Sequence, residues 1–207
     1  VAKMVAKMKE KPWPIYKIKV GTADDIAIVK ALRQNTEAVL RVDANAAWDL
    51  ETALELIPQL KDLGVELVEQ PLAKDNWEGM KVLYRESVLP LYADESCVYE
   101  ADVEKCKDHF HGINIKLTKC SGITPARRMI QKARELNLQI MIGCMNESTI
   151  GSAAIAHLLP FIDHVDMDGP LLLQEDLATG IGYDFGKISY SGEPGLGITY
   201  TGLYSKH

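Results

Sequence analysis

The stretch AVLRVDANAAWDLETALELIPQLKDLGVELVEQP, residues 38–71, decides the fold. It begins and ends with short apolar runs, AVLRVD and VELVE, which predict buried parallel strands. Between the two runs, Asp49 can cap a helix, and Gly64 follows the end of that helix. A strand, a helix and a second strand in this order predict one βα repeat.

The same repeat recurs along the chain. Apolar runs predict seven strands, at residues 15–20, 38–43, 65–69, 89–94, 112–117, 138–143 and 162–167. Helical patterns separate most of these runs, and Thr22 can cap the helix that follows the first of them. This alternation predicts a parallel sheet, either closed as a barrel or open and doubly wound. We favour the barrel, because successive strands each contribute one inward polar group at the same height, whereas open sheets gather ligands at one switch point.

The ends of the sequence do not fit a complete eight-stranded barrel. The chain starts with a helical stretch, residues 1–11, that has no strand before it. We therefore expect residues 1–180 to form a partial (β/α) barrel that lacks one strand. Residues 181–207 are rich in Gly and Tyr and contain β-like segments, and we expect them to pack on a part of the protein outside this sequence.

Composition narrows the class of protein. The 207 residues are 47% hydrophobic, which is enough for one sizeable core. A net charge of −6 without a basic stripe argues against nucleic acid as a partner. Four cysteines without a C-x-x-C pair favour a reducing compartment, and no apolar run reaches membrane-spanning length. We expect a cytoplasmic protein that binds a small molecule.

Three acidic residues mark a predicted metal site. Asp43, Glu69 and Asp94 are 26 and 25 residues apart, which is the length of one βα unit, and each stands at the end of an apolar run. The carboxyl ends of barrel strands converge, so these hard oxygen ligands would meet. The alternative, that they are solvated acids in loops, is weak for three residues in register. The pattern predicts a Mg²⁺ site.

Lysines flank the acids on both sides. Lys17 and Lys19 alternate with Ile18, so a strand would place both ammonium groups on one face, where each should lower the pKa of the other. Lys116 lies on a later strand, residues 112–117, with Asn114 on the same face, and should approach from the other side of the pocket. Two bases on opposite sides permit inversion at a carbon atom next to a carboxylate. An exposed edge strand would also explain K-x-K.

Further polar residues follow the last two strands. Asp166 and Asp168 alternate around Met167 and form a pair suited to a substrate ammonium group, which we favour over the alternative of helix capping or loop solvation. Cys144 and Glu147 lie in the segment MIGCMNESTIG and should line the same mouth. Cys144 also fits a plain core thiol.

These motifs together resemble one known family. The segments K-I-K, R-V-D-A-N, V-E-Q-P, A-D-E-S, N-I-K and D-M-D-G-P, in this order and spacing, are similar to the muconate-lactonizing subgroup of the enolase superfamily. Within it, D-M-D and G-C-M-N-E-S resemble dipeptide epimerases. The resemblance implies a TIM-type (β/α)₈ barrel preceded by an amino-terminal capping domain. On that reading, the first strand and the capping domain are not in this sequence, and residues 181–207 would pack on the cap.

The resemblance also implies a reaction. Lys19 and Lys116 would be the acid/base residues, with Lys17 assisting Lys19, and Asp43, Glu69 and Asp94 would hold Mg²⁺. The resemblance further implies that Asp166 and Asp168 bind the free amino group of a dipeptide, with Cys144 nearby. The expected reaction is epimerisation of an Ala-Glu type dipeptide through an enediolate.

Three alternatives stay open at this point. The same subgroup includes o-succinylbenzoate synthases and N-acylamino-acid racemases, whose substrates have no free amino group. The chain could also be a non-catalytic, metal-binding barrel fragment that acts through its exposed edges as an interaction module. A homo-oligomer is compatible with the sequence as well.

Overall fold

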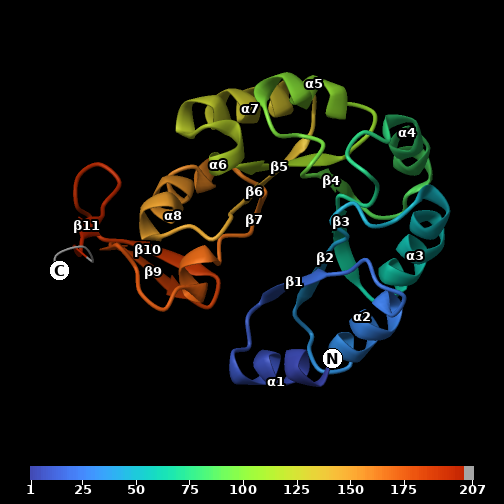
Figure 1. Ribbon diagram of the computed structural model, residues 1–207, viewed down its shortest axis with the longest axis horizontal. Helices are drawn as coiled ribbons and strands as arrows, with labels where there is room; N and C mark the ends of the chain where they lie inside the picture. The colour runs from blue at the N-terminus through green and yellow to red at the C-terminus, as the bar shows by residue number, and fades with distance from the viewer. Residues whose placement is uncertain (203–207) are drawn as a thin grey trace.

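The computed structural model describes residues 1–202 as a curled parallel sheet with helices along its outer side (Figure 1). The seven strands of the sheet lie in chain order: β1 (Ile15–Lys19), β2 (Val39–Asp43), β3 (Val65–Glu69), β4 (Leu91–Ala93), β5 (Gly112–Lys116), β6 (Gln139–Gly143) and β7 (His164–Val165). Every neighbouring pair is parallel. All seven predicted strands are confirmed, although β4 and β7 are shorter than their apolar runs.

Helices connect the strands. They are α1 (Ala2–Glu10), α2 (Asp25–Arg33), α3 (Leu50–Asp62), α4 (Trp77–Glu86), α5 (Val103–Cys106), α6 (Leu117–Cys120), α7 (Ile123–Glu135) and α8 (Thr149–Ala156). The predicted cap of α3 is confirmed, because the Asp49 side chain accepts a hydrogen bond from the Thr52 amide. Gly64 follows this helix with a φ of +73°, the left-handed conformation that glycine adopts without strain.

The predicted cap of α2 is wrong. The helix begins at Asp25 after Asp24, whose side chain makes no capping bond. The Thr22 hydroxyl instead donates to the Asp25 carboxylate, which also accepts from the backbone amides of Gly21 and Thr22. Trp48 donates its indole N–H to the same carboxylate at 2.9 Å. The buried Asp25 therefore fixes the loop after β1 against the loop after β2.

The sheet packs on both faces, as its apolar runs require. Leu40, Val42, Ile113 and Ile140 are fully buried in strands, and helix residues such as Leu60 cover them from outside. This pattern is typical of parallel sheets covered by crossover helices. Within residues 1–202, β1 and β7 form the two edges of the sheet.

An arginine inside the curl joins strands from its two sides. The Arg41 side chain, on β2, is buried, and its Nη1 and Nη2 atoms lie 3.4 Å from the Val165 oxygen and 3.0 Å from His164 Nδ1, both on β7. Its Nε atom donates to Glu66 at 2.6 Å. These contacts hold strand β2 to strand β7 without a backbone pair between them.

The end of the described chain forms small antiparallel pairs. Strand β8 (Ala178–Thr179) pairs with β11 (Thr199–Tyr200), and β9 (Ile181–Asp184) pairs with β10 (Lys187–Tyr190). The β-like character predicted for this segment is confirmed up to the described limit, whereas residues 203–207 of it lie outside the described residues. The segment contacts α8, because the Tyr190 hydroxyl donates to the Ala156 oxygen at 2.7 Å.

None of the helices in residues 1–202 combines the length and the apolar character that crossing a membrane requires.

The Asp25 carboxylate yields a stability prediction. We expect Asp25→Asn to lower the free energy of unfolding by about 2–4 kcal/mol, because an amide NH₂ group would face buried N–H donors. Urea unfolding measures the change. Asp24→Asn is the matched control, since its exposed side chain makes no capping bond, and it should change the free energy by less than about 0.5 kcal/mol. Equal effects of the two substitutions would contradict this role for Asp25.

Candidate active site

The three predicted metal ligands lie together at the carboxyl end of the sheet. Asp43 and Glu69 are the last residues of β2 and β3 and are register partners, while Asp94 directly follows β4. Their exposed fractions are 0%, 0% and 1%. Buried carboxylates are costly unless paired, so their surroundings must supply positive charge or hydrogen-bond donors.

Strand β1 supplies two of the cations. The Lys17 Nζ atom lies 2.9 Å from Glu69 Oε2 and 3.6 Å from Asp43 Oδ2, and it also contacts Asp166. The Lys19 Nζ atom lies 2.5 Å from the same Asp43 oxygen. The predicted shared face of Lys17 and Lys19 is therefore confirmed, with Asp43 as their common partner.

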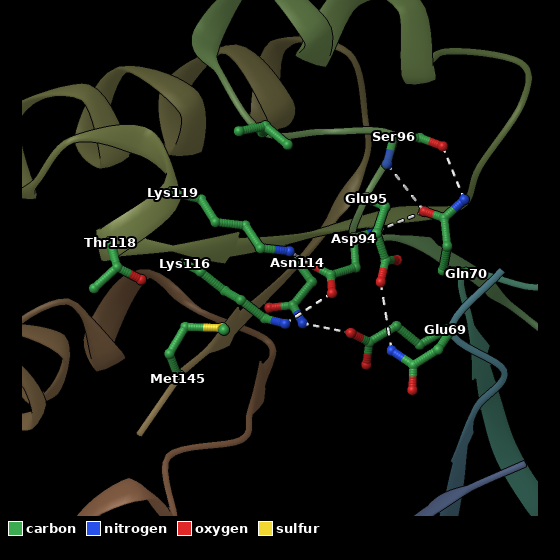
Figure 2. A network of polar contacts seen from close by, with 12 residues as sticks. Glu69, Gln70, Asp94, Glu95, Ser96, Asn114, Lys116, Thr118, Lys119 and Met145 are labelled. Atoms are coloured by element: carbon green, nitrogen blue, oxygen red, sulfur yellow. Dashed lines mark hydrogen bonds and ion pairs between the residues drawn. The ribbon is translucent and has the colours of Figure 1, made fainter. Parts of the chain in front are cut away.

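Strand β5 and the turn after it supply the donors on the other side (Figure 2). Lys116, the last residue of β5, places its Nζ atom 2.7 Å from Asp94 Oδ2. Lys119, in α6, lies 2.7 Å from the other oxygen of Asp94. The Asn114 amide donates to Glu69 Oε1 at 2.7 Å. Two ammonium groups thus hold Asp94, while Glu69 is bound from both sides of the pocket.

These contacts shift the pKa values of the buried groups. Burial lowers the pKa of Lys17, but the carboxylates that face it, Glu69 foremost, outweigh burial and raise that pKa above its ordinary value. Burial likewise lowers the pKa of Lys116, and Asp94 more than reverses the effect. Burial raises the pKa of Glu69, which Lys17 only partly offsets. For Asp94, the two lysines outweigh burial, so its pKa lies below its ordinary value.

The expectation that the K-x-K pair lowers a lysine pKa is therefore wrong for Lys17. The alternation of the strand places two ammonium groups on one face, but it does not show what they meet there. The carboxylates of Glu69, Asp43 and Asp166 all contact Lys17, and nearby opposite charges favour the charged form of an ammonium group.

The three carboxylates are suitable ligands for Mg²⁺, but in this structure they bind lysine ammonium groups. Three buried carboxylates at neighbouring strand ends are the hard oxygen ligands that this ion prefers. Among residues 1–202, however, no three His, Cys, Asp or Glu side chains are arranged so that they would hold a metal ion as they stand. The lysine ammonium groups contact the same oxygens, so Mg²⁺ and the lysines would compete for them.

The predicted substrate-binding acids have separate partners. Asp166 contacts Lys17, whereas Asp168 accepts from the Cys144 thiol at a sulfur-to-oxygen distance of 3.6 Å. Burial raises the pKa of Cys144 to about 12, so this side chain is a neutral thiol. Glu147, also predicted to line the mouth, accepts from the Met145 amide and the Thr118 hydroxyl.

Sequence reasoning missed two residues of this site. Lys119 follows Lys116 by three residues, a spacing that places both on one side of a helical turn, but the short helix α6 gave no periodic signal. Gln70 directly follows Glu69 and is fully buried. The sequence offered one sign of its role: Gln70 is a polar residue in a segment expected to be buried, directly before a proline.

Comparison with known proteins agrees with this geometry. A sequence profile of the family described as "Enolase C-terminal domain-like" matches residues 1–202. The chain is 58% identical over 199 residues to an L-Ala-D/L-amino acid epimerase of Flavobacterium johnsoniae, which covers 96% of this chain and 59% of that protein. It is 37% identical over 185 residues to an L-Ala-D/L-Glu epimerase of Bacteroides thetaiotaomicron, covering 89% and 48% respectively.

Solved structures show the same similarity. A dipeptide epimerase from Cytophaga hutchinsonii, in complex with Mg and the dipeptide D-Ala-L-Val, superposes with a TM-score of 0.91 at 30% identity, covering 98% of this chain and 58% of that one. The L-Ala-D/L-Glu epimerase from Bacillus subtilis in a substrate-liganded complex gives 0.89 at 35% identity, covering 95% and 58%. The chain thus spans less than two thirds of the length of these relatives.

Lys17 provides a test of the competition between lysine and metal. We expect Lys17→Met to lower the free energy of unfolding by about 3–5 kcal/mol, because Glu69 and Asp43 would lose a buried cation. Added Mg²⁺ should then raise the melting temperature of this variant more than that of the wild type, since a cation would replace the missing charge. Differential scanning calorimetry with and without Mg²⁺ measures both effects.

Lys105→Met is the control for this test. The Lys105 side chain is 63% exposed and lies 3.6 Å from Asp102, so its loss should leave both the melting temperature and the Mg²⁺ effect as in the wild type. A Mg²⁺ effect that is no larger in Lys17→Met than in the wild type would contradict competition at this site.

Proposed function

Since the chain belongs to the enolase C-terminal domain-like family, we propose that it carries the barrel portion of a Mg²⁺-dependent dipeptide epimerase. The proposed reaction inverts the α-carbon of the carboxy-terminal residue of an Ala-Glu type dipeptide. The observation that carries the proposal is the placement of Lys19 and Lys116 on strands β1 and β5, each on a different carboxylate of one buried cluster.

The carboxylate cluster is the proposed metal site. Mg²⁺ bound by Asp43, Glu69 and Asp94 would hold the substrate carboxylate and stabilise the negative charge that develops when the α-proton leaves. The burial of all three side chains supports this assignment, because a dry site strengthens such electrostatic interactions. Asn114 would keep Glu69 oriented through its 2.7 Å hydrogen bond.

The two lysines divide the proton transfers between them. On one epimer of the substrate, Lys19 removes the α-proton as a base and Lys116 delivers a proton to the opposite side of the carbon, and on the other epimer these roles reverse. Lys17 would assist Lys19 through its contacts with Asp43 and Glu69. A carboxylate that binds one of these ammonium groups must release it before that lysine can reach the substrate.

Asp166 and Asp168 are the proposed site for the substrate ammonium group, with Cys144 beside it. Support comes from their place directly after β7, at the same end of the sheet as the lysines. Among the described residues, Asp168 forms no ion pair and its side chain accepts a hydrogen bond from a neutral thiol, which would leave it available to a substrate cation. Substrates with a blocked or absent amino group would lack this interaction, which favours dipeptides over N-acylamino acids and o-succinylbenzoate precursors.

The architecture of the complete protein is also a proposal. We infer that the seven described strands belong to an eight-stranded barrel and that further chain covers the edges formed by β1 and β7. The relatives' greater length supports this inference. Within this arrangement, residues 1–180 are the barrel part, and the segment 181–207 would contact a capping domain.

Exchange of the α-proton tests the proposed reaction. The chain, Mg²⁺ and L-Ala-L-Glu are combined in D₂O, and ¹H NMR follows the Glu α-proton signal and the appearance of the L,D diastereomer. We expect loss of the signal together with epimerisation. Equal activity on an N-acetylated substrate would contradict the ammonium site. No exchange with any free dipeptide, by this chain and by a longer protein that includes the proposed capping domain, would contradict the proposed function.

Two variants separate the roles of base and metal ligand in the same assay. Lys116→Ala should stop α-proton exchange for one substrate epimer and keep it for the other, whereas Asp43→Asn should stop exchange for both. For Lys116→Ala the expected loss is about 10²–10⁴-fold, the usual contribution of a general acid or base. Lys105→Ala, at an exposed position, is the control. Full activity of both Lys116→Ala and Asp43→Asn would contradict the roles proposed for these residues.

A further inference from the structure

Gln70 is a buried polar residue to which the reaction gives no role. It directly follows Glu69, has an exposed fraction of 0% and adopts a left-handed backbone conformation with φ of +36°. A non-glycine residue in this region costs free energy, so neighbouring contacts must hold it there. Buried side-chain amides need partners for both the oxygen and the nitrogen.

The Gln70 amide has partners for both its oxygen and its nitrogen, and Figure 2 shows its bonds to Asp94 and Ser96. Its Oε1 atom accepts from the backbone amides of Asp94 at 2.9 Å and Ser96 at 3.1 Å. Its Nε2 atom donates to the Ser96 hydroxyl at 2.8 Å and to the Leu72 oxygen at 2.9 Å. The Ser96 hydroxyl in turn donates to the Lys74 oxygen at 2.8 Å.

The backbone of Gln70 makes two further hydrogen bonds, one to a neighbouring strand and one to a neighbouring loop. Its amide donates to the Tyr92 oxygen on β4 at 2.8 Å, and its carbonyl oxygen accepts from the Ala46 amide, in the loop after β2, at 2.8 Å. One residue therefore binds the loops that follow β2, β3 and β4. These are the three loops that begin beside Asp43, Glu69 and Asp94.

We propose that Gln70 is the positioning residue that sets where the Asp94 carboxylate stands relative to Glu69 and Asp43. It touches neither the lysines nor the proposed substrate position, so it acts through Asp94. This inference deepens the proposed function and rests on it, because its consequence is the affinity of the carboxylate cluster for Mg²⁺. Groups behind metal ligands typically contribute to metal affinity in this way.

A purely structural role is the competing explanation. Fixing three loops would also stabilise the fold, and loss of any buried hydrogen bond lowers stability. The two explanations differ in what they predict for folded protein. Positioning requires that metal affinity falls while the variant is fully folded, and that the loss depends on Asp94 being present.

The test compares Gln70→Met with Gln139→Met. Methionine keeps the approximate length of glutamine but offers neither the oxygen acceptor nor the NH₂ donor. Gln139, at the opposite end of the sheet, accepts the Tyr92 hydroxyl at 2.7 Å, so its substitution also removes a hydrogen bond to β4 but leaves Asp94 alone. Isothermal titration calorimetry measures Mg²⁺ affinity, and amide hydrogen exchange by NMR is measured at Asp94 and Ser96.

The expected result is a Mg²⁺ affinity about 10–100-fold weaker in Gln70→Met, with amide exchange at Asp94 and Ser96 about tenfold faster. Gln139→Met should keep both quantities near the wild type. In an Asp94→Asn background, Gln70→Met should cause no further loss of affinity. If Gln70→Met does not fold, Ser96→Ala, which removes one partner of Nε2, should show a smaller loss in the same direction.

Affinity within about twofold of the wild type in folded Gln70→Met or Ser96→Ala, with unchanged exchange at Asp94, would overturn the positioning role. An equal loss with and without Asp94 would overturn it as well and favour general destabilisation. If the wild type binds no Mg²⁺ while the Gln70 variant still exchanges faster at Asp94 and Ser96, the proposed function fails and the positioning of Asp94 stands.

Discussion

The burial of negative charge at the mouth of the curled sheet is the constraint on which the rest of this structure depends. Four carboxylates, from Asp43, Glu69, Asp94 and Asp166, contact four ammonium groups, from Lys17, Lys19, Lys116 and Lys119. Placing one carboxylate in an apolar interior costs several kcal/mol unless a partner compensates. Each of these carboxylates contacts at least one of the ammonium groups, and Asp43 and Asp94 each contact two.

The parallel sheet delivers these groups to one place. Because the strands run in the same direction and in sequential order, the residue that ends each strand arrives at the same edge, and the curl turns these ends toward one another (Figure 1). Below this layer, Arg41 joins β2 to β7 through its contacts with His164 and Val165. At the level of the site, Lys17 joins the two edges of the sheet, because this residue of β1 contacts Asp166, which follows β7. Side chains thus tie the two edges of the sheet together.

Much of this was predictable from the sequence, and the limits have physical causes. The strands and the positions of Asp43, Glu69 and Lys19 follow from apolar runs, because burial on both faces leaves a continuous signal. The partners of these residues do not follow, since spacing fixes a face and a height but not the side chains that approach from other strands. The pKa of Lys17 was predicted in the wrong direction for this reason.

Short segments set a second limit. Helix α6 is too short to show a periodic pattern, so the sequence does not predict Lys119 as part of the site. The sequence predicts Thr22 as the cap of α2, because Asp25, which accepts a hydrogen bond from Thr22, resembles an ordinary acid in the first turn of a helix. Gln70 lies in the motif V-E-Q-P, in which the sequence predicts a role for the glutamate alone. Polar residues that position neighbouring groups, and do not bind a substrate, are not revealed by their spacing in the sequence.

Anomalous diffraction from a crystal of this chain soaked in Mn²⁺, a cation that prefers the same oxygen ligands as Mg²⁺, would show whether the carboxylate cluster binds a metal ion in place of the lysines. The account predicts an anomalous peak bounded by the carboxylates of Asp43, Glu69 and Asp94, with the lysine ammonium groups displaced from the oxygens that face it. A peak elsewhere, or lysines that keep their contacts with all three carboxylates at saturating Mn²⁺, would contradict it.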